Sequence, residues 1–418
     1  MVSGTSEKLV GKFPKGAVTP PASKSLGHRA VICAALAGGG AVRGLSMSED
    51  IRATIGGMEA LGAAFREDGG ALTALGSAKP GVGGGRVVDC NESGSTLRFL
   101  IPLAALSGGE TLFLGRGRLM ERPLGVYAEA FAGKGVEFSQ DLRGVRVKGP
   151  FRGGECLVAG DVSSQFVSGL LLALPLTEKG GTVRLRGELE SRQYVDMTID
   201  VMRAFGAKVE ETPTEYRVEG GQGYAPAEYG VEGDFSQAAF FLGAAALGRD
   251  TRCLGLNRES RQGDRAILEI LGNMGAETVW REDGSVTVAT RGGRLKGITM
   301  DARENPDLAP PVAALCALAE GESRIVNAGR LRLKESDRLS AMAENLARLG
   351  ARVREGADAL FIEGTPSLRG GFADAKGDHR IAMAMALAAI RCEGPLLLRG
   401  WESVGKSYPN FWRDFEGE

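Results

Sequence analysis

Helix-like segments in this chain end repeatedly on a glycine that is followed by a small residue and a short strand-like run. The segments read LGAAF, KGVEF, FGAKV, MGAET and LGARV, and their glycines are Gly62, Gly135, Gly206, Gly275 and Gly350. A glycine just past a helix end is a common C-cap, so one instance means little. These glycines are 73, 71, 69 and 75 residues apart. The near-constant spacing predicts a structural repeat of roughly 70 residues.

A second series, of apolar helices rich in small residues, runs in step with the glycines. The helices are predicted to start near His28, Ser95, Ser163, Ser236, Asp307 and His379. Each is followed by a turn and a short strand, as in TLFLG after the second helix and PLLLRG after the sixth. This alternation of helix and strand indicates α/β layers, so the chain is predicted to fold as two α/β domains of three repeated units each.

The two ends of the chain are incomplete in complementary ways. The sixth unit ends on a predicted helix at Tyr408–Phe415 and lacks a closing strand, whereas the chain begins with a lone strand at Lys8–Phe13. We expect the N-terminal strand to complete the last unit. One domain then comprises residues 1–20 and 233–418, and the other comprises residues 21–232, with a ligand cleft between the two domains.

Composition narrows the class of protein. The 418 residues carry a net charge of −1, which does not favour nucleic acid or a membrane surface as a partner. Six scattered cysteines without a C-x-x-C motif, and only two histidines, argue against a disulfide framework and a metal site. The first residues lack an apolar signal region, and no apolar run reaches about 18 residues. We expect a cytoplasmic protein.

The starts of the predicted buried helices carry the candidate chemistry. The residues there are Lys24, Ser25 and Arg29; Gly94, Ser95 and Arg98; Ser163, Ser164 and Gln165; Asp307; and His379 with Arg380. Serine and aspartate are ordinary N-caps, but a cation opposes the positive end of the helix dipole. Arginine suits carboxylate and phosphate oxygens, which it binds with two parallel hydrogen bonds. The helix starts are therefore predicted to converge on an anionic ligand.

Three further stretches carry charges that could join this site. GRGRLMERPL places Arg122 just before a proline, and VGKSYP places Lys406 in a glycine-flanked loop. RLRLKESDRLSAM holds Lys334, Glu335 and Arg338, and the four-residue spacing of its two cations predicts a shared helix face. Taken alone, the KESDR stretch is explained more simply as a solvated first turn with an internal ion pair, and Lys406 as an ordinary surface lysine.

Taken together, these pieces resemble the 5-enolpyruvylshikimate-3-phosphate synthase family over nearly the full length. SKS-x3-R, SGST-x-R, LMERP, SSQF, RLKESDR and GDHR follow one another in the family's order and spacing. The resemblance implies the enolpyruvyl transferase fold, an inverse α/β barrel of two domains, each with three βαβαββ-type units. It also implies a monomer without cofactors that uses phosphoenolpyruvate and shikimate 3-phosphate and releases inorganic phosphate.

The resemblance further implies roles for single residues. Shikimate 3-phosphate would be bound by Lys24, Ser25, Arg29, Ser163, Ser164, Gln165, Ser191, Tyr194, Asp307 and Lys334. Phosphoenolpyruvate would be bound by Lys24, Gly94, Arg122, Gln165, Arg338, Arg380 and Lys406. Asp307 would accept the proton of the attacking ring hydroxyl, and Glu335 with Lys334 would handle the proton that reaches the methylene carbon. Lys24, between the two substrates, completes the catalytic set.

Two residue roles are undecided, and three alternative functions are disfavoured by the sequence, which has no cysteine in GRGRLMERP, keeps both Asp307 and Glu335, and is nearly neutral. Glu92 stands where the family usually has asparagine, and Arg330 where some members do, so the roles of both are undecided. A sister enolpyruvyl transferase acts on UDP-N-acetylglucosamine, but it typically has a reactive cysteine in the loop that corresponds to GRGRLMERP. A silent phospho-ligand binding protein would be expected to lack Asp307 or Glu335. A nucleic-acid clamp would need a broad basic face.

Overall fold

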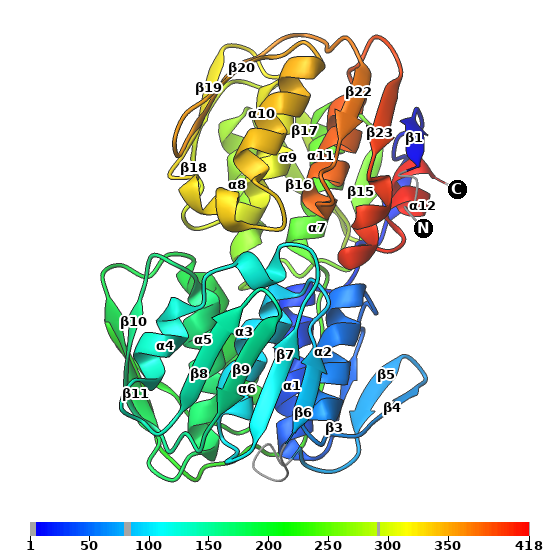
Figure 1. Ribbon diagram of the computed structural model, residues 1–418. Coiled ribbons are helices and arrows are strands. Elements are labelled where there is room, and N and C mark those ends of the chain that lie inside the picture. The colour runs from blue at the N-terminus through cyan, green and yellow to red at the C-terminus, as the bar shows by residue number, and fades with distance from the viewer. Residues whose placement is uncertain (1–5, 79–84, 291–292, 418) are drawn as a thin grey trace. The chain divides into compact units, whose positions relative to one another are not determined.

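The structure is a computed structural model and describes residues 6–78, 85–290 and 293–417. The chain divides into two compact units. The first, which we call the middle unit, is Ala22–Val231; the second, the terminal unit, consists of Met1–Pro21 and Glu232–Glu418. Within each unit the sheets lie around the helices (Figure 1). The mixed α/β fold confirms the predicted fold class.

The middle unit contains three repeats of a buried helix, a more polar helix and a small sheet. Its helices are α1 (Lys24–Ala37), α2 (Glu49–Ala60), α3 (Gly94–Ala104), η1 (Leu119–Glu121), α4 (Gly125–Phe131), α5 (Ser164–Ala173), η2 (Leu174–Leu176) and α6 (Arg192–Ala204). Its strands are β3 (Gly40–Arg43), β4 (Phe65–Asp68), β5 (Ala71–Ala74), β6 (Arg86–Asp89), β7 (Glu110–Leu114), β8 (Glu137–Asp141), β9 (Gly144–Lys148), β10 (Gly154–Ala159), β11 (Gly181–Arg186), β12 (Glu210–Glu211), β13 (Glu215–Val218) and β14 (Ala227–Gly230).

The terminal unit repeats the same plan with segments from both chain ends. Its helices are α7 (Phe235–Ala246), η3 (Gly263–Ala266), α8 (Ile267–Asn273), η4 (Pro306–Leu308), α9 (Ala309–Cys316), η5 (Gly329–Leu333), α10 (Arg338–Arg348), α11 (His379–Ala389), η6 (Trp401–Lys406) and α12 (Phe411–Glu416). Its strands are β1 (Glu7–Val10), β2 (Gly16–Val18), β15 (Thr251–Cys253), β16 (Ala276–Trp280), β17 (Val286–Thr290), β18 (Thr299–Asp301), β19 (Glu322–Val326), β20 (Arg352–Glu355), β21 (Leu360–Glu363), β22 (Gly371–Asp374) and β23 (Leu396–Arg399). The last helix, predicted to begin at Tyr408, begins three residues later.

Within the described residues the strands form six small sheets, of which five have four strands in one common topology and the sixth has three strands in the corresponding order. Their strand orders are β14-β3-β5-β4, β6-β7-β9-β8, β10-β11-β13-β12, β2-β15-β17-β16, β18-β19-β21-β20 and β22-β23-β1. In each sheet the first two strands are parallel and are followed by antiparallel neighbours. A parallel pair needs a crossover, which a buried helix such as α3 provides between β6 and β7. The N-terminal strand β1 pairs antiparallel with β23, with Glu7 opposite Arg399.

The repeat glycines lie where the polar helices end. Gly62, Gly135, Gly206, Gly275 and Gly350 follow α2, α4, α6, α8 and α10, and all five have positive φ, between 75° and 97°. Residues with a side chain rarely adopt this conformation, so glycine is selected at each of these turns. The spacing seen in the sequence therefore reflects a backbone requirement that recurs in five of the six repeats, three in the middle unit and two in the terminal unit.

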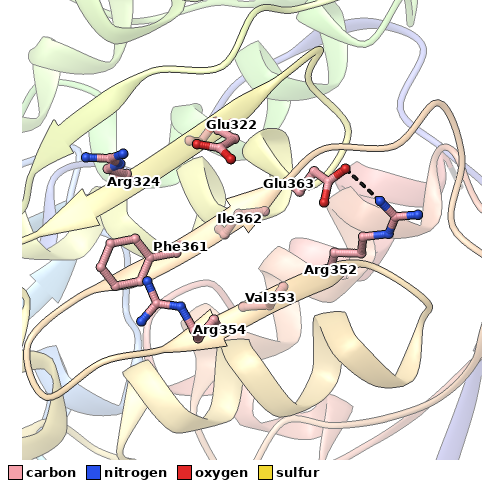
Figure 2. A pocket seen from close by; sticks show the side chains of 9 residues that line it. Glu322, Arg324, Arg352, Val353, Arg354, Phe361, Ile362 and Glu363 are labelled. Carbon is pink, nitrogen blue, oxygen red and sulfur yellow. Dashed lines mark hydrogen bonds and ion pairs between the residues drawn. The ribbon is translucent and has the colours of Figure 1, made fainter.

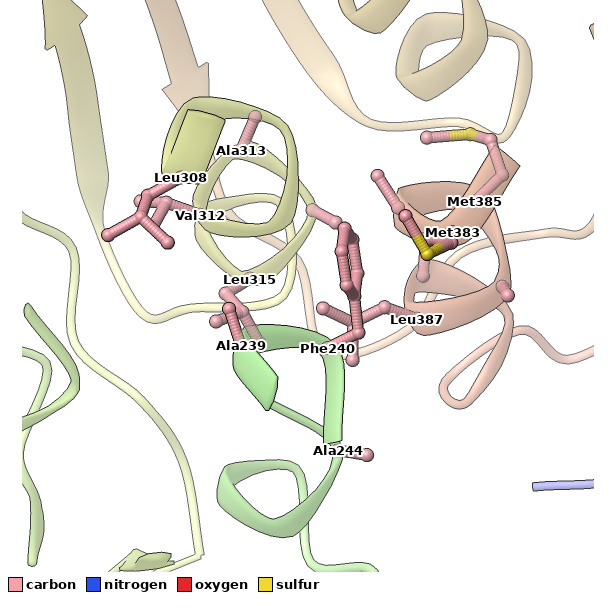
Figure 3. Packing of buried hydrophobic residues seen from close by; sticks show 14 of the residues in the cluster. Ala239, Phe240, Ala244, Leu308, Val312, Ala313, Leu315, Met383, Met385 and Leu387 are labelled. Atoms are coloured by element: carbon pink, nitrogen blue, oxygen red, sulfur yellow. The ribbon is translucent and has the colours of Figure 1, made fainter. Parts of the chain in front are cut away.

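Three helices rich in small residues, α7, α9 and α11, form the core of the terminal unit. Figure 3 shows their side chains gathered around Phe240, Leu315 and Leu387. A β-carbon added at Gly243 in α7 would lie 3.0 Å from Cδ2 of Leu387, so a larger residue there would require the Leu387 side chain to shift. α1, α3 and α5 are buried in the same way in the core of the middle unit.

Candidate active site

Lys24 is the first residue of α1, a position that disfavours a cation. Its Nζ lies 2.7 Å from Oδ2 of Asp50, which is in the first turn of α2. The two side chains are only 18% and 12% exposed. This partly buried carboxylate offsets the unfavourable position of the lysine and fixes the direction of its side chain.

The Arg29 guanidinium, which is buried, connects α1 with the start of α6. Its Nε donates to Oγ1 of Thr198 at 2.7 Å, and its Nη2 donates to the backbone carbonyl oxygen of Tyr194 at 2.9 Å. Its Nη1 donates to the carbonyl oxygen of Ser25 at 2.6 Å. Burial lowers the pKa of Arg29 to about 10, so the side chain keeps its charge at neutral pH. These bonds bring Ser25, Arg29 and Tyr194 together.

Gln165 links the start of α5 to the start of α3. Its Nε2 donates to Oγ of Ser95 at 2.9 Å, and its Oε1 accepts from Nη1 of Arg98 at 3.1 Å. The backbone N–H of Gln165 donates to Oγ of Ser163, the N-cap of α5, and Ser164 beside it is buried. The serines of SSQF are therefore part of a helix start that is held against a second one.

Gly94 is the first residue of α3, and two arginine side chains approach it closely. A β-carbon added there would lie 2.7 Å from Nη1 of Arg122 and 2.8 Å from Nη1 of Arg98. The backbone of Arg122 is held by Gln140, whose Nε2 donates to the Arg122 carbonyl oxygen at 2.9 Å. The missing side chain thus lets two cations meet over a helix start, where backbone N–H groups also attract anions.

Ser191, just before α6, has φ 57° and ψ 43°, a left-handed conformation that is uncommon for a residue with a side chain. It is 3% exposed. Such backbone strain concentrates at ligand sites, where the surrounding structure holds it in place. Ser191 and Tyr194 lie in the same helix start, which Arg29 contacts.

In the terminal unit, Asp307 lies in η4 and its carboxylate meets three cations. Oδ1 lies 3.5 Å from Nζ of Lys334 and 3.0 Å from Nη1 of Arg338, and Oδ2 lies 2.9 Å from Nη2 of Arg380. The Asp307 side chain is 22% exposed. Glu335 joins the same cluster, because its Oε2 lies 2.7 Å from Nη2 of Arg338. The structure therefore gathers these five predicted residues into one network.

Asp378 explains why α11 begins with basic residues. It is the N-cap of the helix, it is 0% exposed, and its Oδ1 accepts from the backbone N–H of Arg380 at 2.9 Å. Its Oδ2 accepts from Nε of Arg338 at 2.8 Å and from Oγ of Ser336 at 3.1 Å. Burial alone would raise the pKa of Asp378, but the Arg338 guanidinium lowers it below its ordinary value. A buried anion thus occupies the helix start.

The two arginines of this cluster are strengthened as cations by the same carboxylates. Burial acts to lower the pKa of Arg338, but Asp378 and then Glu335 and Asp307 raise it overall. Burial likewise opposes the charge of Arg380, and Asp307 raises the pKa of this arginine above its ordinary value. Both side chains are therefore fixed positive charges with little solvent around them.

One local prediction about this cluster is wrong. Lys334 and Arg338 do not share a helix face, because α10 begins at Arg338 after its N-cap Asp337, and Lys334 is extended after η5. The two cations meet at Asp307 through the tertiary fold. Lys406, in η6, donates from Nζ to the carbonyl oxygen of Gly377 at 2.7 Å, which places it beside the N-cap of α11.

The two residues that depart from the family pattern lie against protein groups. A β-carbon added at Gly117 would lie 2.7 Å from Oε2 of Glu92, so this carboxylate packs against the loop before η1. Nη2 of Arg330 donates to the backbone carbonyl oxygen of Arg303 at 2.6 Å.

Sequence reasoning missed Asp50 and Asp378, which hold Lys24 and Arg338 respectively. Asp378 had a local signal, since an aspartate directly before a helix is a typical N-cap. Asp50 had none, because 26 residues separate it from Lys24.

A groove with a volume of about 570 Å³ lies on the strands β19, β20 and β21. Its lining includes Arg354, whose guanidinium lies 3.8 Å from the ring centre of Phe361, and an ion pair between Arg352 and Glu363 at 2.7 Å (Figure 2). None of the predicted site residues lines this groove. Over the described ranges, no helix has the length and apolarity of a membrane span, and no cluster of His, Cys, Asp or Glu side chains is suited to hold a metal ion.

The repeated units and charged helix starts define a protein with the enolpyruvyl transferase fold. The enolpyruvyl transferase NikO from Streptomyces tendae superposes with a TM-score of 0.77 over 98% of this chain and 96% of that chain, at 20% sequence identity. An EPSP synthase structure from Acinetobacter baumannii has a TM-score of 0.77 at 28% identity, over 97% of this chain and 96% of that one.

The sequence comparisons identify the family within that fold. The profile described as EPSP synthase (3-phosphoshikimate 1-carboxyvinyltransferase) matches residues 11–415. A 3-phosphoshikimate 1-carboxyvinyltransferase from Clostridium perfringens is 42% identical over 96% of this chain and 95% of its own length. One from Clostridium acetobutylicum is 43% identical over 96% of this chain and 94% of its own length. The chain belongs to the EPSP synthase (3-phosphoshikimate 1-carboxyvinyltransferase) family.

Proposed function

We propose that this chain transfers the enolpyruvyl group of phosphoenolpyruvate to the 5-hydroxyl of shikimate 3-phosphate and releases inorganic phosphate. The reaction runs by addition and elimination through a tetrahedral intermediate and serves aromatic amino-acid biosynthesis. Family membership over residues 11–415 supports the reaction. The chemistry assigned to single residues rests on the geometry of the two units taken separately.

Shikimate 3-phosphate is assigned mainly to helix starts of the middle unit. Its proposed ligands are Lys24, Ser25, Arg29, Ser163, Ser164, Gln165, Ser191 and Tyr194, with Asp307 and Lys334 at the reacting hydroxyl. The arginine links between α1 and α6 support this assignment, because they bring hydroxyl groups and a buried cation together. Helix N-termini also offer unpaired N–H groups to a phosphate.

Phosphoenolpyruvate is assigned to residues at which cations gather. Its proposed ligands are Lys24, Gly94, Arg122, Gln165, Arg338, Arg380 and Lys406. The approach of Arg122 and Arg98 to Gly94 supports the part of the site in the middle unit. In the terminal unit, the raised pKa values of Arg338 and Arg380 support the role of both as permanent positive charges.

The acid–base chemistry is assigned to the carboxylate cluster of the terminal unit. Asp307 takes the proton of the attacking hydroxyl, and Glu335 with Lys334 delivers a proton to the methylene carbon. In the elimination, phosphate leaves the former carbonyl-level carbon while Glu335 takes a proton back from the methyl carbon, and this restores the double bond. Arg338 and Arg380 bond to Asp307 and are also proposed ligands of phosphoenolpyruvate. When substrate oxygens take over these bonds, Asp307 is left as a carboxylate that can accept a proton.

The observation that carries this proposal is the meeting of Asp307 with Lys334, Arg338 and Arg380. A base beside fixed cations suits a reaction in which a proton leaves one substrate while negative charge develops on the other. The cations stabilise the tetrahedral intermediate, and the carboxylate makes the hydroxyl nucleophilic.

The test is phosphate release from phosphoenolpyruvate with shikimate 3-phosphate, with UDP-N-acetylglucosamine, and with no acceptor. We expect release only with shikimate 3-phosphate, and a fall of about 10²–10⁴-fold in kcat for Asp307→Ala. Asp301→Ala is the matched control, since Asp301 pairs with Arg303 in the same unit at 2.6 Å. Release with UDP-N-acetylglucosamine instead would overturn the proposed acceptor. Equal activity of Asp307→Ala and Asp301→Ala would overturn the proposed base.

A further inference from the structure

Four buried polar side chains form a continuous hydrogen-bonded chain in the middle unit. Nδ1 of His28 in α1 lies 2.7 Å from Oγ1 of Thr54 in α2, which lies 2.7 Å from Oγ1 of Thr96 in α3. The Thr96 hydroxyl lies 2.7 Å from Oγ of Ser93, the N-cap of α3. All four residues are at most 1% exposed. None of them belongs to the proposed substrate ligands, so their polarity needs another explanation.

All hydrogen bonds of this network are donated in the same direction, from His28 towards Ser93. The Thr96 hydroxyl has one hydrogen, which it donates to Ser93 at 2.7 Å, while the carbonyl oxygen of Asp50 is farther away at 3.5 Å. Thr96 must then accept from Thr54, and Thr54 in turn must accept from Nδ1–H of His28. The reverse order would leave a buried N–H at Nε2 of His28, which has no hydrogen-bond partner among the described residues. An unpaired buried donor is costlier than an unpaired acceptor.

His28 is well suited to begin such a chain as a neutral donor. Burial lowers the pKa of His28 well below its ordinary value, and the nearby charges of Lys24 and Arg29 lower it further. The ring also packs edge-on against Phe99 in α3, with ring centres 6.4 Å apart. α1 and α3 are therefore joined both by the polar chain and by this contact.

This chain of hydrogen bonds ends at Ser93, beside the proposed phosphoenolpyruvate site. Ser93 Oγ also accepts from the backbone N–H of Thr96 at 3.1 Å, which fixes the first turn of α3, where Gly94 is the first residue. α2 contributes Thr54 to the middle of the chain, and one turn earlier it contributes Asp50, whose carboxylate holds Lys24. One helix thus sets the positions of both Lys24 and Gly94.

We propose that His28, Thr54, Thr96 and Ser93 are positioning residues that hold the start of α3 at a fixed place relative to α1 and α2, so that Gly94 and Lys24 bind phosphoenolpyruvate in a preorganised arrangement. The inference rests on the proposed function. Breaking this hydrogen-bonded network displaces Gly94, which is assigned to phosphoenolpyruvate alone, whereas Lys24, which is assigned to both substrates, stays paired with Asp50. Phosphoenolpyruvate binding should therefore weaken, and shikimate 3-phosphate binding should stay nearly unchanged.

The experiment measures KM for each substrate separately in Thr54→Val, Thr96→Val and Thr54→Ser. Valine keeps the shape of threonine and removes the hydroxyl. We expect KM for phosphoenolpyruvate to rise roughly tenfold in both valine variants, as for one lost buried hydrogen bond, and KM for shikimate 3-phosphate to stay within about twofold. Thr54→Ser restores the hydroxyl and is expected to restore KM.

Thr177→Val is the matched control, because Thr177 is also buried and donates its hydroxyl hydrogen to a backbone carbonyl in the same unit, at η2. It should lower the melting temperature without changing either KM. If Thr54→Val and Thr96→Val also lower the melting temperature without changing either KM, the hydrogen-bonded network only stabilises the fold and the inference is wrong. Wild-type protein that releases no phosphate with shikimate 3-phosphate would instead overturn the proposed function.

Nitrogen NMR of histidine-labelled protein tests the direction of the chain independently of activity. The sequence has only two histidines, so His28→Gln identifies the His28 signals. We expect a protonated Nδ1 and an unprotonated Nε2 at neutral pH. A protonated Nε2 with an unprotonated Nδ1 would mean that the hydrogen bonds run in the opposite direction, and the proposed direction would be wrong.

Discussion

The same dipeptide, His-Arg, occurs near the start of a buried helix in each unit, but the two helix starts are held by different chemistry. In α1, Arg29 donates to a threonine hydroxyl and two backbone carbonyl groups, and burial lowers its pKa to about 10. In α11, Arg380 bonds to the Asp307 carboxylate, which raises its pKa. Identical residues therefore differ in charge stability because their partners differ.

The comparison distinguishes two ways of holding a cation near a helix start. The middle unit holds Arg29 with neutral hydrogen bonds, although Lys24 at the start of the same helix is paired with the Asp50 carboxylate. The terminal unit balances Lys334, Arg338 and Arg380 against Asp307, Glu335 and Asp378. An acid–base reaction needs such carboxylates, whereas binding a phosphate does not. This difference supports placing the catalytic carboxylates in the terminal unit.

The largest loss of stability is expected from a change at the start of α11, where the Asp378 carboxylate pairs with Arg338. Asp378→Asn removes the fully buried one of the three carboxylates that contact Arg338, at 2.8 Å. Breaking a buried ion pair costs up to roughly 3–5 kcal/mol, and Glu335 and Asp307 still contact the arginine. The free energy of unfolding should fall by up to that amount in chemical denaturation. Asp374→Asn, in the same unit, is the control, because the side chain of Asp374 accepts from the backbone of Lys376 near the surface. Equal effects of both changes would contradict the ionic interpretation.

A smaller loss of stability is expected from a change near the start of α1, where neutral groups hold Arg29. Thr198→Val removes the hydroxyl that accepts from Nε of Arg29 at 2.7 Å, and a hydrogen bond to a charged group contributes roughly 1.5–3 kcal/mol. The same unfolding measurement should show a loss below that of Asp378→Asn. A larger loss for Thr198→Val would reverse the ranking of the two helix starts.

Gly94→Ala should affect binding and leave stability almost unchanged. The added methyl group meets the mobile ends of Arg122 and Arg98, which can move away, and alanine is the better helix former. We expect KM for phosphoenolpyruvate to rise about tenfold, or roughly 1.4 kcal/mol, with an unchanged or slightly higher melting temperature. Gly125→Ala, at the start of α4 with open space around it, is the control. An unchanged KM for phosphoenolpyruvate in Gly94→Ala would mean that Gly94 is not part of the phosphoenolpyruvate site.

The smallest effect concerns the pH dependence of stability. The folded-state pKa of His28 lies well below its ordinary value of 6.5, so below about pH 6.5 the unfolded chain takes up a proton that the folded chain does not. His28 therefore contributes stability above that pH, and the contribution is lost as the pH falls, by at most about 1.4 kcal/mol per pH unit. Unfolding measured from pH 7.5 to 5 should show a shallower slope for His28→Gln. Identical slopes would mean that His28 is not buried as a neutral ring.

Much of the fold could be predicted because its signals are local. The six buried helices, the glycine turns and the α/β class each depend on residues close together in sequence, and the structure has all of them. The family, and with it the reaction, could also be predicted, because several short motifs occur in a fixed order. Lys334 was misplaced because spacing alone cannot show that α10 begins only at Arg338.

The sequence by itself determined where helices start, where glycine must turn the chain, and which cations stand at unfavourable helix positions. These features follow from backbone geometry and helix dipoles, which act over a few residues. Only the tertiary structure decided which partners offset those cations: Asp50 for Lys24, Thr198 for Arg29, and Asp307 for Arg380. Those partners are 26 to 169 residues away in the chain. Burial then set their strength, because charges and hydrogen bonds act most strongly where folding has excluded water.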